Sequence, residues 1–441
     1  MTSQKIILID ISKLGQGRKA GIYRVIENLI THMQRYNNYI IYFCASTGNY
    51  RLCKKYFKGN HSFDSKMFVY PKRINLLSII LKIFLIISNI LTRGLEVLDE
   101  FFFKNRLLRN FFEFLAQFLS TFKSFFLALY MRNESNRAIP NDFISQIDVY
   151  LSPFHPFPNQ ILKNNKIKRF VIIHDVIAMN HPKYFFKGFL DQLKKLIDNF
   201  NNEDHIICVS ESTKRDLLNY RKDLNENNII VSHLAVADEI KRIKDIYTIN
   251  NVKTKFKIEK EKFLLSVCTL EPRKNLVRII RNFIKLCEEG KIDDTNLVLV
   301  GRKGWKYDEI FNEWENNSKY ISKIIFTGYV NDEEMSALMS GCLYFVYISL
   351  YEGFGLPPLE AMKCGAPVIT SNNSSLPEVV GNNALKVDPT NDEEIRSAMY
   401  KLYTDENLRN DLSNKSLEQA AKFSWEKTTA KIMQFIETVT K

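Results

Sequence analysis

Short apolar runs, each followed by a polar loop and an amphipathic stretch, recur along most of this 441-residue chain. Runs of this length without apolar–polar alternation are typical of strands buried on both faces of a parallel sheet. The strand–loop–helix order therefore predicts an α/β fold built on parallel sheets. The runs cover residues 6–11, 39–44, 67–70, 147–151, 169–173 and 205–209 in the first half, and 263–267, 297–300, 324–326, 343–348 and 368–370 in the second.

The length and the repetition of this pattern in both halves predict two domains. A chain of 441 residues is too long for one comfortable core. We expect two Rossmann-like domains that face a cleft, an N-terminal domain over residues 1–245 and a C-terminal domain over 246–423. A last helix over 424–441 is expected to cross back to the N-terminal domain.

The charge balance and the cysteines narrow the class of partner and the compartment. The chain carries 62 Lys and Arg against 49 Asp and Glu, a net charge of +13, which favours an anionic partner. No zinc-finger spacing or RNA-binding signature is present, so we expect no nucleic-acid partner. The seven cysteines are scattered without a Cys-x-x-Cys pair, and the N-terminus lacks a signal-peptide pattern. These features predict a cytoplasmic protein.

Residues 74–137 interrupt the α/β pattern with a long apolar run and a phenylalanine-rich stretch. The first run has about the 18 residues at which a membrane span becomes conceivable. Lys82 interrupts it, however, and no second clear span follows, which disfavours a true span. Lysines and arginines mixed with large apolar residues are typical of a helix lying in the headgroup region of a membrane. A helical insertion packed on the domain or in an oligomer interface is the alternative.

The stretch after the apolar run 343–348 combines glycines, prolines and two carboxylates. Gly353 and Gly355 allow a close approach of the backbone, and the prolines at 357–358 suit a first helical turn. The helix that follows would direct its N-terminus, with free N–H groups, at a diphosphate. Glu352 and Glu360 are then placed to accept hydrogen bonds from sugar hydroxyls. This stretch predicts a nucleotide-sugar site at the carboxyl edge of the second sheet.

Three further segments follow strand-like runs. Arg273 and Lys274 are adjacent cations that can neutralise a diphosphate, and a lysine can follow the charge that builds on a leaving group. His174 can hydrogen-bond a sugar hydroxyl or a phosphate, and Asp175 can orient it or cap the next helix. Residues 210–215 are typical of a helix cap and a following turn.

The glycine-rich loop formed by Gly15, Gly17 and Gly21 is a candidate acceptor or phosphate loop, together with Asp175. It is not a Walker motif, because no Gly-Lys-Ser/Thr follows. No Asp-x-Asp or His-rich cluster stands out, so we expect no metal and no other cofactor.

Together these motifs resemble glycosyltransferase family 4, the retaining GT-B glycosyltransferases, in its mannosyltransferase-like branch. The second half carries the more specific matches, over residues 270–276, 328–330, 352–370 and 374–381. The first half matches at 152–156, 174–175, 181–182 and 209–212. Two departures are Cys268, where a glycine is expected, and Tyr23, where a glycine is common.

The resemblance implies a GT-B fold and three catalytic residues, Glu352, His174 and Lys274. Glu352 would contact the donor sugar near the reacting carbon, and Lys274 would bind the donor diphosphate together with Arg273. His174 would lie by the donor sugar and the acceptor. Family members do not require a metal for donor binding, and the leaving phosphate helps to take the acceptor proton.

The resemblance also assigns the rest of the donor. Glu360 would hold the ribose, and Val330 would lie at the nucleobase. Backbone N–H groups for sugar and phosphate would come from Gly353, Phe354, Gly355 and Leu356.

The expected function is transfer of a sugar from GDP-mannose or a UDP-sugar to a glycan or a lipid-linked acceptor, at the inner face of the membrane. The N-terminal domain would bind the acceptor. Two alternatives stay open: a non-catalytic GT-B module that binds a sugar nucleotide as a scaffold at the membrane, and another GT-B enzyme such as a nucleotide-sugar epimerase.

Overall fold

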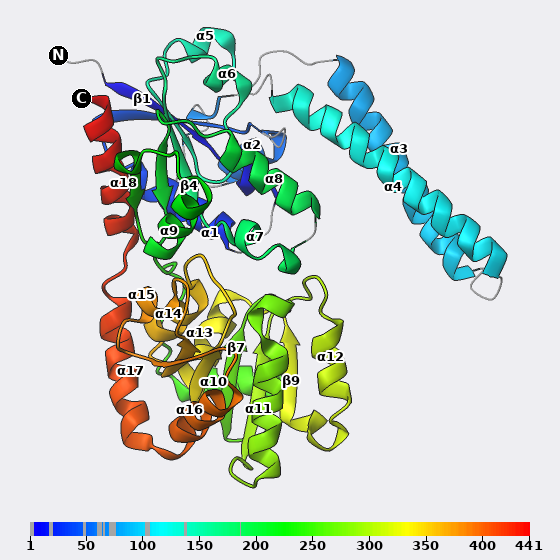
Figure 1. The fold of residues 1–441 in the computed structure, drawn as a ribbon, viewed down its shortest axis with the longest axis vertical. Coiled ribbons are helices and arrows are strands. Elements are labelled where there is room, and N and C mark those ends of the chain that lie inside the picture. The colour runs from blue at the N-terminus through cyan, green and yellow to red at the C-terminus, as the bar shows by residue number, and fades with distance from the viewer. Residues whose placement is uncertain are drawn as a thin grey trace. The chain divides into compact units, whose positions relative to one another are not determined.

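The computed structural model describes residues 4–16, 21–46, 50–59, 64, 67–69, 76–101, 106–135, 139–185 and 187–441, and all structural statements below refer to these. The chain forms two six-stranded sheets (Figure 1). The first has the order β2-β1-β3-β4-β5-β6 and the second β12-β11-β10-β7-β8-β9. The strands are β1 Lys5–Asp10, β2 Tyr39–Cys44, β3 Val149–Ser152, β4 Lys168–Ile173, β5 His205–Cys208, β6 Ile229–Val231, β7 Lys262–Val267, β8 Thr295–Val300, β9 Ile324–Gly328, β10 Tyr344–Tyr347, β11 Val368–Ser371 and β12 Leu385–Val387.

Neighbouring strands in both sheets run parallel, which confirms the predicted α/β class with parallel sheets. The apolar strands are buried as their composition predicts: Ile7, Leu8 and Ile9 of β1 and Phe263 and Leu264 of β7 have no exposed surface. A parallel strand covered on both faces needs such an uninterrupted apolar run.

The predicted strand over 67–70 is wrong within the described residues. Only Phe68 pairs, as an isolated bridge with Phe43, and Tyr70 lies outside the described residues. One isolated bridge to Phe43, near the end of β2, does not make a strand. The sequence analysis also missed β6 and β12, which are three residues each and leave little periodicity to detect.

Helices fill the connections between strands. Their bounds are α1 Ile22–Met33, α2 Tyr50–Gly59, α3 Leu76–Phe101, α4 Arg106–Ser135, α5 Asn141–Ile144, α6 Asn159–Leu162, α7 Ile177–Asn180, α8 Lys187–Asp198, α9 Glu211–Tyr220, α10 Ile246–Lys255, α11 Leu276–Glu288, α12 Asp308–Glu315, α13 Asp332–Gly341, α14 Leu356–Lys363, α15 Leu376–Val380, α16 Asp392–Thr404, α17 Glu406–Ala420 and α18 Trp425–Thr440. In α11, Leu276, Ile279, Ile280 and Phe283 are buried at the spacing of one helical face.

The chain divides into two compact units, and the boundary passes through β4. One unit comprises Met1–Val171, Glu203–His205 and Val439–Lys441, and the other comprises Ile172–Asn202 and Ile206–Thr438. The domain boundaries predicted at residues 245 and 423 stay a prediction. In the first unit the Lys5 ammonium donates to the carbonyl of Thr440, and in the second Thr428 of α18 donates to the carbonyl of His233 at 2.7 Å.

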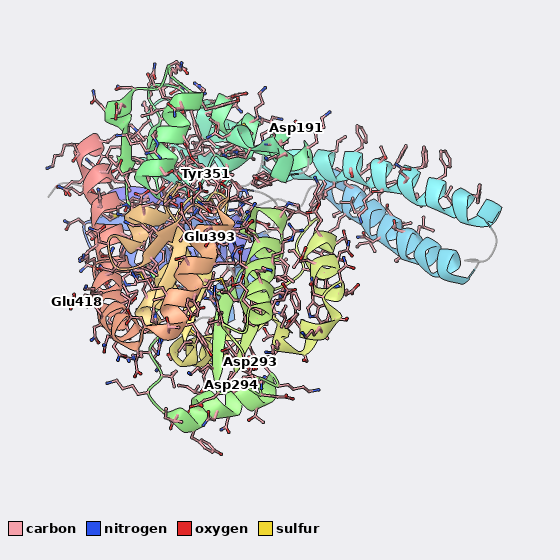
Figure 2. All side chains as sticks on the ribbon, turned by 60° about the horizontal axis from the view of Figure 1, so that its bottom comes forward. Asp191, Asp293, Asp294, Tyr351, Glu393 and Glu418 are labelled. Carbon is pink, nitrogen blue, oxygen red and sulfur yellow. The ribbon has the colours of Figure 1, made fainter. Side chains whose placement is uncertain are left out.

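Helices α3 and α4 are joined by four residues and lie side by side in both views (Figure 1 and Figure 2). The rings of Phe84 and Phe126 meet between them with centroids 4.0 Å apart. We call this pair the helical hairpin. None of the described helices, including these two, is long and apolar enough to cross a membrane.

Candidate functional site

The candidate site is built where two neighbouring strands of the second sheet end. Strands β7 and β10 pair in parallel, so the loops that follow them meet at one edge of the sheet. The loop after β7 ends in a short 3-10 turn, Pro272–Lys274, and the left-handed residue Asn275 with φ 60°. The Asn275 amide donates to the carbonyl of Ile348 after β10 at 3.1 Å, which ties the two loops together.

The structure brings Arg273, Lys274 and Glu352 into direct contact. The Lys274 Nζ donates to Glu352 Oε1 at 2.5 Å, and the Arg273 Nη1 lies 2.8 Å from Glu352 Oε2. Arg273 also donates from Nη2 to Glu271 Oε1 at 2.7 Å. Two cations and two carboxylates thus form one buried cluster, which we call the charge cluster.

Tyr347, the last residue of β10, completes this cluster. Its hydroxyl donates to Glu352 Oε1 at 2.9 Å and accepts from Lys274 Nζ at 2.8 Å. Tyr347 is not among the predicted site residues, because a tyrosine that ends an apolar strand has the pattern of a core residue. Its role is visible only from the register of β10 against β7.

Burial and neighbouring charge act in opposite directions on the carboxylates. Burial opposes ionisation of Glu352, but Arg273 and Lys274 outweigh it and lower the pKa of Glu352 to about 2. For Glu271, burial dominates and raises the pKa despite the same two cations. Burial and the Glu352 charge raise the pKa of Tyr347 well above its usual value. Glu352 is therefore an anion, and Tyr347 a neutral hydrogen-bond donor, throughout the neutral range.

The loop after Glu352 packs directly against the segment that follows β4, within the same compact unit. A Cβ on Gly353 would lie 2.1 Å from the carbonyl oxygen of His174 and 2.6 Å from Cβ of Asp175. Only glycine fits this approach, as the motif predicted. The Gly353 carbonyl accepts from the hydroxyls of Ser210 at 2.6 Å and Thr213 at 3.0 Å.

His174 and Asp175 therefore lie beside residues 353–355, which we call the glycine loop. The Asp175 carboxylate accepts from the backbone N–H of Ile177 at 3.2 Å, which is the helix-capping alternative considered from the sequence. Burial raises the pKa of Asp175, while Arg273 acts in the opposite direction.

Ser210 shows a contact that the sequence analysis did not foresee. The residue caps α9 by accepting from Thr213 N–H at 2.9 Å, as predicted. The same hydroxyl holds the Gly353 carbonyl. The Glu378 carboxylate accepts from the N–H groups of Glu211 and Ser212 at the start of α9, at 2.9 and 3.1 Å. Only tertiary packing brings these distant segments together.

Helix α14 begins at Leu356, with Gly355 before it at φ 126°. The two prolines occupy its first turn as predicted. Pro357 and Pro358 have no N–H group, and the Leu359 N–H donates to the Gly355 carbonyl at 3.3 Å, so Leu356 is the residue of this first turn whose N–H can face a ligand. Phe354 is buried, and Glu360 lies further along α14.

The remaining predicted residues lie outside the charge cluster. Val330 is buried and lies two residues after the end of β9, whose last residue, Gly328, has φ 71°. Gly15 lies in the 3-10 turn Ser12–Gln16, and Gly21 precedes α1 with φ 50°, both in the other compact unit. Gly17 lies outside the described residues. Among the described residues, no group of three His, Cys, Asp or Glu side chains is arranged to hold a metal ion.

Comparisons with known proteins converge on one family. The sequence profile of the glycosyl transferases group 1 matches residues 248–419. The serotype-specific mannosyltransferase WbdA of Escherichia coli is 34% identical over 267 residues, which are 59% of this chain and 32% of WbdA. The O-antigen chain mannosyltransferase B of Escherichia coli is 31% identical over 276 residues, 62% of this chain and 71% of that relative. The chain thus spans about a third of the length of WbdA.

Solved structures match nearly the whole chain at low sequence identity. A glycosyltransferase from Rickettsia africae has a TM-score of 0.65 at 14% identity, with 100% of this chain and 99% of that one covered. HepE from Anabaena, solved in complex with UDP and glucose, has a TM-score of 0.63 at 13% identity and covers 99% of this chain and 100% of its own. This likeness confirms the two-domain GT-B fold.

The ionised state of Glu352 makes a stability prediction. Its folded pKa of about 2 lies below the usual 4.5, so its stabilising contribution is present above pH 4.5 and is lost as the pH falls toward 2. We expect Glu352→Gln to be less stable than the parent at pH 7, because the partly buried Lys274 loses its carboxylate and the buried Arg273 keeps only Glu271. The difference in unfolding free energy between the parent and Glu352→Gln, measured by urea titration, should become smaller as the pH falls from 4.5 to about 2. A difference that stays constant with pH would contradict an ionised Glu352.

Proposed function

The chain belongs to the glycosyl transferases group 1, in their mannosyltransferase-like branch, and from this premise we propose that it is a retaining hexosyltransferase of cell-surface polysaccharide or glycoconjugate synthesis. The donor is a nucleotide-sugar, GDP-mannose or a UDP-sugar, and the acceptor is a glycan or a lipid-linked glycan. The O-antigen relatives are named mannosyltransferases, which supports a mannosyl donor. UDP and glucose bound to HepE support the nucleotide-sugar class.

The observation that carries the proposal is the pair of ionic contacts that Arg273 and Lys274 make with Glu352 beside the glycine loop. Two cations with little exposed surface at a sheet edge suit a diphosphate, and Glu352 at the same point suits the donor sugar near its reacting carbon. Gly353, whose backbone packs on His174, would bring sugar and acceptor beside that histidine.

The rest of the donor would lie along α14 and β9. Backbone N–H groups of Gly353, Phe354, Gly355 and Leu356 would donate to sugar and phosphate. Glu360 would accept from the ribose hydroxyls, and Val330 would contact the nucleobase.

The proposed reaction forms a bond between the acceptor hydroxyl oxygen and the anomeric carbon on the face that the diphosphate leaves. The bond from that carbon to the phosphate oxygen breaks, and its electron pair goes to the nucleoside diphosphate. The acceptor proton moves to a leaving phosphate oxygen. Lys274 and Arg273 would stabilise the charge that develops on this oxygen, in a site where burial strengthens the interaction.

The charge cluster adds a condition on donor binding. Arg273 and Lys274 are balanced by Glu271 and Glu352, so an arriving diphosphate must compete with Glu352 for Lys274. Competition of this kind would turn Glu352 from the lysine toward the sugar. Glu271 would stay on Arg273 and keep that cation in place.

We also propose that the protein is cytoplasmic and peripheral at the inner membrane face, where residues 74–137 contact the membrane. Lipid-linked acceptors are held at that surface, and a net charge of +13 favours anionic lipids. The loop with Gly15, Gly17 and Gly21 and, in the other compact unit, Asp175 are the proposed acceptor side.

Removal of either half of the ion pair should slow transfer strongly. We expect Lys274→Ala and Glu352→Gln each to lower kcat by on the order of a hundredfold, because charge stabilisation at a reacting centre is lost. Purified protein is screened with nucleotide sugars and membrane lipid extract, with glycosyl transfer as the readout. Lys285→Ala, a half-exposed lysine of α11 paired with Glu288, is the matched control.

Near wild-type turnover in Lys274→Ala or Glu352→Gln would refute the site assignment. Failure of the unmodified protein to hydrolyse or transfer any donor would instead favour the non-catalytic, sugar-nucleotide-binding scaffold. A product of the same mass as the donor would indicate an epimerase.

Tyr347→Phe tests the residue that the sequence analysis missed. The ring stays and only the hydroxyl that joins Lys274 to Glu352 is lost, so we expect kcat to fall roughly tenfold while the fold persists. Tyr344→Phe is a matched control on the same strand, since its buried hydroxyl donates to the Met399 carbonyl at 2.9 Å, away from the cluster. Equal losses of activity in both variants would assign Tyr347 to packing alone.

Metal removal tests the cofactor expectation. The two cations of the charge cluster would take the place that a divalent ion has in metal-dependent enzymes. We expect transfer measured after EDTA treatment to equal that of the untreated protein. Loss of activity in EDTA, restored by added Mg²⁺ or Mn²⁺, would overturn metal independence.

A further inference from the structure

The helical hairpin has a defined inner contact line. Phe84 of α3 and Phe126 of α4 meet there, and Leu81 and Ser88 of α3 are buried on the same line. Residues at these positions are spaced three or four apart, as one face of a helix requires. Phe84 and Phe126 therefore mark the side of each helix that faces the other helix, and angular positions around each axis are measured from them.

Most of the exposed large apolar side chains in the described part of the chain lie on this hairpin. Fourteen large apolar side chains are exposed on it, seven of them between Ile79 and Leu91 and seven between Phe111 and Leu129. Five are exposed elsewhere among the described residues. Scattered single residues need no explanation, but a cluster of this size marks an interaction surface.

These side chains share one face of the hairpin. Angles around each helix axis are counted at about 100° per residue, from Phe84 in α3 and from Phe126 in α4. The exposed apolar positions of α3, with Ile83, Ile87 and Ile90 among them, cover an arc of about 140° that lies on one side of Phe84. Those of α4 apart from Leu127, such as Phe118, fall within about 80° to the same rotational side of Phe126. Because the two helices run antiparallel, equal rotation brings both stripes to the same side. We call it the apolar face.

The opposite face is polar. Lys82 and Asn89 of α3, and Ser120 and Ser124 of α4, are exposed there. Leu127 is the one exposed apolar side chain of the hairpin on that side, among the residues whose side chains the structure describes. A spanning hairpin would put both faces in hydrocarbon, where Lys82 is costly. An amphipathic pair with one apolar face instead suits the boundary between headgroups and acyl chains.

We infer that the helical hairpin lies in the plane of an anionic bilayer and inserts its apolar face at the headgroup boundary, with the polar face in water. This deepens the membrane contact of the proposed function, on which it rests for the acceptor class, by specifying which residues enter the lipid. The net charge of +13 attracts anionic lipid and opposes the stacking of a second copy of the chain on the same face.

Vesicle flotation with a matched pair of variants tests the inference. Ile87→Glu/Phe118→Glu places one carboxylate on the apolar face of each helix, at side chains that are 50% and 53% exposed. Asn89→Glu/Ser120→Glu makes the same charge change on the polar face. On vesicles of phosphatidylcholine with 30% phosphatidylglycerol (an anionic content of the order found in membranes), we expect the first variant to lose at least tenfold in partitioning. The second should stay within about twofold of the parent.

A residue-level readout distinguishes insertion from mere attraction. Phe118→Cys and Ser120→Cys are labelled with an environment-sensitive dye; the native cysteines are buried, apart from the half-buried Cys287. Vesicles should shift the emission of the label at position 118 to the blue and leave the label at 120 unchanged. Equal shifts at both positions would overturn the single-face orientation.

Two other outcomes would overturn the inference. One is a parent protein that does not float. The other is a parent that elutes as a dimer without lipid while Ile87→Glu/Phe118→Glu elutes as a monomer, which would make the apolar face an interface between copies. Donor hydrolysis is measured on all variants, so loss of the proposed catalytic function is recognised separately from loss of membrane binding.

Discussion

The ion pair between Glu352 and its two cations is the interaction on which the rest of the site depends. A buried carboxylate is costly unless opposite charges and hydrogen bonds satisfy it, and here Arg273, Lys274 and Tyr347 all do so. The loop after β7 turns through the left-handed Asn275. This turn places Arg273 and Lys274 in contact with Glu352, which follows β10. Loop geometry, strand register and charge are thus parts of one arrangement.

The glycine loop extends this arrangement to a segment from the first half of the chain. Gly353 has no room for a side chain against His174, and its carbonyl is held by Ser210 and Thr213. A rigid backbone at this point is useful for a transferase, because reacting groups must be held within a fraction of an ångström of productive geometry. The polar residues that rigidify the loop lie outside the donor motif itself.

Two regions of the chain differ in the chemistry that they concentrate. The charge cluster concentrates buried ions at one sheet edge, whereas the helical hairpin concentrates exposed apolar side chains on one face. An acceptor with a lipid anchor and a hydrophilic glycan would need both kinds of surface. The proposed membrane contact and the proposed donor site are therefore complementary parts of one function.

Much of this was readable from the residues, because strand burial and motif chemistry are local properties. The parallel α/β class, the prolines that open α14 and the placement of Lys274 and Glu352 after strands of the second sheet follow from apolar runs and from the positions of their ends. The role of Tyr347, the grip of Ser210 on Gly353 and the common face of α3 and α4 do not. Each depends on strand register or helix phase between segments distant in sequence, and only tertiary packing decides which atoms then come within hydrogen-bonding or van der Waals distance.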